Sequence, residues 1–576
     1  MDQKRLFLAM AISVAILAGF QLLLPKHATP PLPPAQQTVS AAPSLPAGSP
    51  VVPGAQPAAA PPREAPRLPI SAPRLQGSIN LLGAKLDDLV LRDYHETVAK
   101  TSPLVRLLEP QTETQPYYIQ FGWTAPAGAT VKLPDNTTVW TASGGPLASG
   151  HPVTLSWDNG QGQTFQIGLS VDDNYMFSVR QSVRNAGTAS VAVYPWSRIS
   201  RDYTPQTSGY YILHEGLLGV FDRRLKEMTY KTARADSEKT GGLAFSTQGQ
   251  GGWAGITDKY WLTALVPDQA TANVAAFRHV TENGADHYQT DFAAQDPEVI
   301  APGAEAAYQS QVFAGAKEVH LLDRYERTQN IPLFSYAVDF GWFWFLTKPF
   351  FYAIDWLNSV LGNFGLAILV FTVFVKALFF PLASRSYRSM SKMKLLGPKV
   401  QALRERLKDD PARIQSEMMA LYRAEKVNPA SGCLPMLIQI PVFFSLYKVI
   451  FVTIEMRQAP FFGWIHDLSA VDPTNVFTLF GLIPWNPAAL LPFLHLGIWP
   501  LIMGGTMVLQ QRMNPPPADP AQARMFQFMP IIFTFMLAGF PVGLVIYWSW
   551  NNLLTVAQQW FIQRQTRLGE PRMART

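Results

Sequence analysis

The chain has 576 residues, a net charge of +6 and one cysteine, with 15% charged and 12% aromatic residues. Soluble proteins contain about 25% charged residues, so this composition argues against a wholly soluble chain and excludes a disordered one. The single cysteine, Cys433, excludes an intrachain disulfide framework, a Cys-x-x-Cys redox pair and a cysteine-rich metal site.

The first predicted element is an apolar helix over residues 6–24, which follows a short charged N-terminus at 1–5. A helix rises about 1.5 Å per residue, so this segment is long enough to cross the hydrocarbon core of a membrane. A cleaved signal peptide is the alternative. No clean small-x-small site follows the segment, which favours an uncleaved membrane anchor.

The next region combines a linker with a domain of short strands. Residues 25–75 are rich in proline and alanine, and this composition predicts an extended, semi-rigid tether. Over 76–325 the pattern changes, and at 165–171 and 175–179 apolar and polar residues alternate on either side of Asp172-Asp173-Asn174. Repeated alternating strands and turns predict an antiparallel β-sandwich.

Apolar and aromatic segments dominate the rest of the chain. The aromatic stretch 338–354 predicts a helix lying in the outer membrane interface, with a buried strand as the alternative. Five further apolar segments predict membrane-spanning helices, and they are 360–383, 434–453, 491–509, 528–540 and 542–562. With the N-terminal anchor, the sequence predicts six spans.

Basic residues predict the orientation of these spans. The segment 384–432 contains 11 Lys and Arg against 5 Asp and Glu, so the positive-inside rule places it in the cytoplasm. Its leucine spacing and the Asp410-Pro411 start signal predict a helical hairpin. Alternation then places both termini, the loop 510–526 and the tail 563–576 in the cytoplasm. The linker, the β domain and the loop 454–490 are predicted outside.

The sequence gives no sign of bond-breaking catalysis. It contains no Gly-x4-Gly-Lys-Ser/Thr loop, no His-Glu-x-x-His and no Gly-x-Ser-x-Gly, and its nine histidines lack ligand spacing. We therefore expect neither an enzyme nor a protein that binds a cofactor or a metal.

Polar residues inside the predicted spans are the candidate functional groups. A lysine at the bilayer centre costs about 2.5–3.5 kcal/mol, so Lys376 is a functional candidate, although snorkelling to the interface is the alternative. Thr372 shares its helix face, and Gln439 lies at a comparable depth in the next span. In the last span one stripe contains Trp548, Asn551, Asn552 and Thr555. Together these residues predict a wet, cationic recess that opens toward the cytoplasm.

Several long stretches resemble a known family. They are residues 418–441 (MMALYRAEKVNPASGCLPMLIQIP), Arg457-Gln-Ala-Pro, Trp464-Ile-His-Asp-Leu-Ser and Phe528-Met-Pro-Ile-Ile-Phe-Thr. All closely resemble the YidC/Oxa/Alb family of membrane protein insertases, and the similarity covers the whole chain. It fits the Gram-negative type, with a large periplasmic domain and a five-helix core.

The resemblance implies an ATP-independent insertase and chaperone of the inner membrane. Lys376 occupies the position of a groove residue that is usually arginine, and Thr372 matches a groove threonine. Tyr547-Trp548 stands where the family commonly has two tyrosines. For the external β domain the resemblance implies a galactose-mutarotase-like supersandwich, which by itself implies no sugar activity.

The implied mechanism assigns three sets of residues. The substrate groove comprises Lys376, Thr372, Gln439, Tyr547, Trp548, Asn551, Asn552 and Thr555. A hydrophobic slide for incoming helices comprises Leu437, Phe443, Phe444, Ile532, Phe533 and Met536. Recruitment in the cytoplasm is assigned to Arg385, Arg388, Lys392, Lys394, Lys399, Arg404 and Arg406.

The implied partners are nascent membrane proteins, the Sec translocon with its accessory subunits, the ribosome, the signal-recognition-particle receptor and anionic lipid. Two other readings of the sequence stay open. One is a secondary transporter, which the lack of an evident internal repeat disfavours. The other is a structural docking factor of the translocon without insertion activity of its own.

Overall fold

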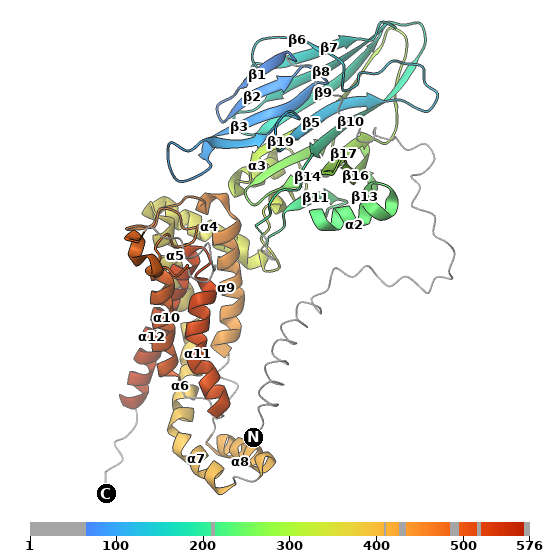
Figure 1. Cartoon of the computed structure of the whole chain (residues 1–576). Coiled ribbons are helices and arrows are strands. Elements are labelled where there is room, and N and C mark those ends of the chain that lie inside the picture. Colours follow the sequence, from blue (N-terminus) through green and yellow to red (C-terminus); the bar gives the residue numbers. More distant parts are fainter. Residues whose placement is uncertain are drawn as a thin grey trace, which may run out of the picture.

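The computed structural model describes residues 65–208, 213–407, 410–425, 434–483, 495–514 and 520–568. These residues form a β domain and a bundle of helices that extends away from it (Figure 1). The expected anchor at 6–24 and most of the expected linker at 25–75 lie outside the described residues.

Two antiparallel sheets make up the β domain. The first has the order β1 (Arg67–Ser71), β2 (Leu75–Asn80), β3 (Lys85–His95), β5 (Tyr117–Thr124), β10 (Val191–Arg201), β17 (Ala285–Ala294), β16 (Ala272–Glu282) and β13 (Leu243–Gln250), with β4 (Leu104–Leu108) on β3 and β18 (Glu298–Ile300) on β10. The second has the order β12 (Arg224–Thr229), β11 (Gly216–Phe221), β14 (Trp253–Thr257), β15 (Trp261–Pro267), β19 (Glu305–Ala316), β9 (Met176–Asn185), β8 (Gln163–Val171), β7 (Val153–Asp158) and β6 (Thr141–Ser143).

Alternating side chains form the core between the sheets. Along β8, every second residue is buried, and the strand pairs with β9 through the turn that follows it. Asp172 shapes this turn, because its Oδ1 accepts hydrogen bonds from the backbone N–H groups of Asn174 and Met176. The strand–turn–strand prediction for this region is therefore confirmed.

The β domain begins earlier than the sequence pattern suggested. Strand β1 lies within the expected linker, at the edge of its sheet. Its Leu68 and Ile70 are buried, whereas Pro69 faces outward. Proline is tolerated there, because an edge strand leaves one row of N–H groups without a strand partner.

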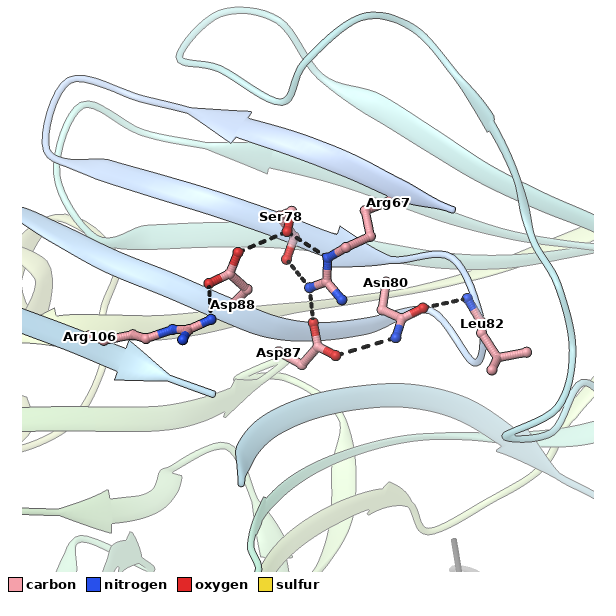
Figure 2. Close-up of polar contacts among 7 residues, drawn as sticks. All are labelled: Arg67, Ser78, Asn80, Leu82, Asp87, Asp88 and Arg106. Atoms are coloured by element: carbon pink, nitrogen blue, oxygen red, sulfur yellow. Dashed lines mark hydrogen bonds and ion pairs between the residues drawn. The ribbon is translucent and has the colours of Figure 1, made fainter. Parts of the chain in front are cut away.

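Polar contacts tie β1 to its neighbours (Figure 2). Arg67 pairs with the buried Asp87 of β3 and donates from Nε to Ser78 Oγ over 2.7 Å. Ser78 Oγ in turn donates to Asp88 Oδ2 over 2.9 Å, and Asp88 pairs with Arg106 of β4. The sequence did not predict this strand, because the segment is rich in proline. Composition contains no information about pairing between strands that are distant along the chain.

The helices are bounded as follows. Within or beside the β domain lie α2 (Tyr230–Thr240), α3 (Val319–Thr328) and the 3-10 turn η1 (Phe334–Ala337). The bundle and its extensions comprise α4 (Trp344–Leu361), α5 (Phe364–Leu378), α6 (Phe380–Leu395), α7 (Gly397–Arg406), α8 (Pro411–Ala424), α9 (Leu434–Val452), η3 (Ile454–Met456), η4 (Val476–Gly481), α10 (Ile498–Met513), α11 (Pro520–Leu537) and α12 (Val542–Leu568).

Local signals explain where the first bundle helices begin and end. Asp339 Oδ1 accepts a hydrogen bond from Gly341 N, and Gly341 has a φ of 71°, so the aromatic stretch forms a turn before α4 begins. Gly362 ends α4 in a left-handed conformation, and Asn363 caps α5 by accepting from Leu366 N. The helix expected at 338–354 therefore lies at 344–361.

A break divides the segment expected as one span at 360–383. Helices α5 and α6 meet at an angle of 67°. Pro381 lies at the start of α6 and has no N–H to donate to the preceding turn, which accounts for a break there. Among the described residues, no single helix has both the length and the apolar character of a membrane span, whereas α5 and α6 together satisfy that test as a bent pair.

Helices α7 and α8 lie at the end of the bundle farthest from the β domain (Figure 1). The Asp410 side chain caps α8 by accepting from Arg413 N over 3.0 Å. Two ion pairs join the helices, Lys399–Glu425 at 2.7 Å and Arg406–Glu417 at 2.6 Å.

The β domain and the bundle share one apolar core, which continues from the sheets to residues of α4, α5, α9 and η3. Polar contacts surround this junction, and they include Lys348–Asp323, His320–Asp355, Arg457 to the His95 carbonyl, and Glu455 to Val319 N. Glu455 Oε1 accepts the Val319 N–H over 2.9 Å at the start of α3. Its other oxygen, Oε2, is shielded from solvent.

Glu455 makes the junction sensitive to pH. Burial raises the pKa of its carboxyl from 4.5 to about 7, and the nearby Glu318 and Asp355 add to this increase. A carboxyl with a raised pKa favours the folded state most when it is protonated, so stability falls as the pH rises from about 4.5 to about 7. We expect Glu455→Gln to reduce this fall, as measured by thermal unfolding midpoints at about pH 5 and about pH 8.

The matched control is Glu305→Gln, which removes an exposed carboxylate on β19. It should keep the pH dependence of the unmodified chain. An equal pH dependence in the Glu455 variant would contradict the assignment of this group.

Candidate functional site

Lys376 lies in the last turn of α5, where three helices meet. Its Nζ donates to Thr555 Oγ1 of α12 over 2.9 Å and lies 3.5 Å from Gln439 Oε1 of α9. In the part of the chain that the structure describes, no carboxylate lies within ion-pair distance of this ammonium group. The lysine is therefore held by neutral oxygen atoms alone.

A hydrogen-bonded series extends from Lys376. Gln439 Nε2 donates to the hydroxyl of Tyr547, which is fully buried in α12. Thr555 Oγ1 donates to the carbonyl of Asn551, so its lone pairs can accept from Lys376. Asn551 is buried one turn away, and its Oδ1 has no hydrogen-bond partner among the described residues. The structure thus brings together five of the predicted groove residues.

A small cavity of about 50 Å³ adjoins this cluster. Its walls come from α5, α6, α9 and α12 and include Lys376, Tyr387, Gln439 and Gln558. One water molecule needs about 10–15 Å³ and polar partners, and the ammonium group of Lys376 with the side chains of Gln439 and Gln558 can supply such partners in this otherwise mainly apolar space.

Two of the predicted groove residues direct their hydrogen bonds to groups outside the Lys376 cluster. Thr372 is buried one turn before Lys376, and its hydroxyl donates to the Ile368 carbonyl of its own helix. Asn552 donates from Nδ2 to Thr506 Oγ1 of α10 over 3.1 Å. One step along a helix turns a side chain by about 100°, so Asn552 points away from the face that Asn551 shares with Thr555.

Trp548 contacts the predicted slide instead of Lys376. Its ring centroid lies 4.5 Å from that of Phe443 on α9 and 6.2 Å from that of Phe533 on α11. Phe444, Ile532 and Met536 are exposed on the same two helices. The side chain of Leu437 lies outside the described residues.

The predicted recruitment residues divide into two groups. Arg385, Arg388 and Lys392 are exposed on α6. Lys399 and Arg406 are engaged in the ion pairs between α7 and α8, and Arg404 is half-buried. The side chain of Lys394 lies outside the described residues.

Sequence reasoning missed two members of the cluster. Gln558 donates from Nε2 to the Lys376 carbonyl over 3.2 Å, and Tyr387 lines the cavity. Gln558 could have been found by extending the stripe from Asn551 through Thr555 by one more turn. Tyr387 could not, because it follows the break between α5 and α6. In the described part of the chain, no group of His, Cys, Asp and Glu side chains could hold a metal ion.

Comparison with known proteins places this chain in a family. Residues 67–353 match the family described as the YidC periplasmic domain, and residues 356–569 match the family described as 60Kd inner membrane protein. The membrane protein insertase YidC of Granulibacter bethesdensis is 61% identical over 100% of both chains. The chain belongs to the YidC family of membrane protein insertases.

Another relative agrees with this assignment. The YidC insertase of Acidiphilium cryptum is 56% identical over 87% of this chain and 84% of its own. A crystal structure of an active YidC insertase, with its first transmembrane domain resolved, aligns with 86% of this chain and 92% of its own, at 17% identity and a TM-score of 0.35.

Family membership settles the general function. This YidC chain is a membrane protein insertase of the inner membrane, and its β domain is the periplasmic domain of the family. It acts on nascent membrane proteins, and its family is not a family of enzymes. The resemblance of the sequence to insertases is thus confirmed.

The packing of Trp548 gives a prediction about stability. Trp548→Ala removes the indole between Phe443 and Phe533 and leaves a cavity where α9, α11 and α12 meet. We expect a loss of about 3 kcal/mol, the lower end for large aromatic truncations, because the residue is only partly enclosed. Thermal unfolding in detergent would measure it.

Trp560→Ala is the matched control, because Trp560 lies on the same helix and is 55% exposed. It should change the midpoint little. Equal losses of stability in the two variants would show that the aromatic contacts of Trp548 do not stabilise the fold.

Proposed function

We propose that this YidC insertase moves the hydrophilic segment of a client along the cluster around Lys376. The observation that carries the proposal is the ammonium group of Lys376, which has only neutral partners in the described structure. A charge in a poorly solvated position attracts an opposite charge more strongly than it would in water. An acidic residue of a client is the group that this position would attract.

The neighbouring polar groups support the same step. A client backbone that leaves water needs replacement hydrogen bonds, since an unsatisfied buried polar group costs about 1–3 kcal/mol. Gln439, Tyr547 and Asn551 offer donors and acceptors along the path, and the adjoining cavity can hold water. The cluster would lower the barrier for a polar tail without forming a covalent bond.

The exposed apolar residues of α9 and α11 would guide the hydrophobic part of the client. Phe444, Ile532 and Met536 expose apolar surface on α9 and α11, the two helices whose Phe443 and Phe533 contact Trp548. A client helix could leave along this surface into lipid, because lipid chains and apolar side chains are equivalent surroundings for it.

We infer the membrane orientation and the partners from charge. Helices α7 and α8 lie at the end of the bundle away from the periplasmic domain, and α6, which bears exposed bases, leads to them, which supports a cytoplasmic location (Figure 1). In this arrangement six helices span the membrane and both termini are cytoplasmic. Arg385, Arg388 and Lys392 would then meet anionic lipid, the ribosome or the signal-recognition-particle receptor, and the protein would act alone or with the Sec translocon.

The charge of Lys376 can be tested by insertion into liposomes. Lys376→Glu should abolish insertion of a small client with an acidic loop, because the reversed charge repels that loop. Lys376→Arg should retain most of the activity, since it preserves the charge. Protease protection of the client measures insertion.

A double reversal separates charge from folding. A client whose acidic loop is changed to a basic one should insert better with Lys376→Glu than with the unmodified protein. Normal insertion of the acidic client by Lys376→Glu would refute the charge role.

The exposed bases of α6 give a second prediction. Replacing Arg385, Arg388 and Lys392 by glutamate should weaken co-sedimentation with ribosomes, and the remaining binding should depend less on salt. The matched control is reversal of Arg224, Lys226 and Lys239 in the periplasmic domain, which are exposed and lie outside both cavities. Equal ribosome binding by all three proteins would contradict this recruitment role.

A further inference from the structure

A second and much larger cavity lies where the periplasmic domain meets the bundle. Its volume is about 950 Å³, and it shares no residue with the cavity beside Lys376. One wall belongs to α9, another to the turn before α4, and the third to the periplasmic domain around β12 and α2. This volume is within the range of cavities that bind organic ligands.

One end of the cavity is apolar and continues onto the outside of the bundle. Ile440, Phe444 and Tyr447 of α9 line it at i, i+4 and i+7, so they form a single stripe. Ile440 is 44% exposed and Phe444 is 42% exposed. The stripe is therefore shared between the cavity and a surface that faces the hydrocarbon of a membrane in an inner-membrane protein. Trp342, which is 63% exposed, flanks the opposite wall.

The other end of the cavity is polar, and its charges sum to a small negative value. Lys448 pairs with Asp339 at 2.8 Å, and Asp339 also accepts the backbone N–H of His214 over 3.1 Å. Burial lowers the pKa of His214, so this ring is counted as neutral. The lining contains two lysines, Lys231 and Lys448, against three carboxylates, and it therefore carries one net negative charge. The carboxylates are Glu215, Glu227 and Asp339.

We propose that this cavity binds one phospholipid with a zwitterionic, ammonium-bearing headgroup, of the phosphatidylethanolamine type. An acyl chain would lie along the apolar stripe of α9, and the headgroup would occupy the polar end. The excess of one carboxylate favours a ligand that contains a cation, so it selects against anionic lipids. Continuity with the surface of the bundle that faces lipid supplies an entry path for such a molecule.

The proposal goes beyond membrane insertion at Lys376. A lipid in this position would touch the periplasmic domain and α9 at once, and would add contact area where the two parts meet. Binding a ligand to the folded state alone raises its stability. The lipid composition of the membrane would thus affect how firmly the periplasmic domain is held on the bundle.

The experiment uses the full-length protein with its single native cysteine replaced, Cys433→Ser, and a fluorophore attached at Thr207→Cys. Thr207 lines the cavity and is exposed. The labelled protein in detergent is titrated with phosphatidylethanolamine or phosphatidylglycerol, both with the same brominated acyl chains, which quench the fluorophore on contact. We expect phosphatidylethanolamine to bind at least about fivefold more tightly, as one additional charge-assisted contact would give.

Variants identify the groups that select the headgroup. The double variant Glu215→Gln/Glu227→Gln should remove the preference between the two lipids, and Glu227→Gln alone should reduce it if the double variant fails to fold. The matched control Glu238→Gln/Glu305→Gln, at two exposed positions outside the cavity, should leave the preference unchanged.

Three results would overturn the proposal. They are equal quenching by the two lipids, stronger quenching by phosphatidylglycerol, and an absence of quenching by either. Cross-linking of a client helix to a photoreactive group at position 207, with no displacement by phosphatidylethanolamine, would assign the cavity to the client instead.

Discussion

The ammonium group of Lys376 is the constraint around which the helical bundle is arranged. A lysine at this depth is tolerated only if other helices supply oxygen atoms, and α12 does so through Thr555 while α9 does so through Gln439. Tyr547 then fixes the amide of Gln439 by accepting its N–H. The three helices are held together by a charge that neutral groups solvate without cancelling it, and the proposed insertion path depends on that uncancelled charge.

Packing and ion pairs join the periplasmic domain to this bundle. One apolar core runs through both, and ion pairs such as Lys348–Asp323 and Lys448–Asp339 surround it. Glu455 sits within the same junction with a carboxyl whose pKa is raised by burial. Packing and buried charge at the junction therefore connect the periplasmic side of the insertase to α9, the helix that also supplies Gln439.

The predictions from sequence agreed with the fold where the interactions are local along the chain, and failed where they join distant residues. The β8–β9 hairpin was predictable, because strand alternation and the Asx turn at Asp172 are local signals. Strand β1 was missed, because Pro69 and its neighbours resemble a linker until Arg67 is seen to pair with β3. The break between α5 and α6 was missed for a similar reason, since hydropathy does not change where Pro381 interrupts the helix.

The sequence by itself determined the family, the strand pattern and the residues able to carry the site, because periodicity, charge and long matching stretches are properties of the linear chain. It placed Lys376, Gln439 and Thr555 in one predicted recess from their depth and spacing. Only the tertiary structure turned Asn552 toward α10, added Gln558 to the cluster and opened the cavity beneath the periplasmic domain. These features depend on how helices are rotated and packed against one another, and no single helix contains that information.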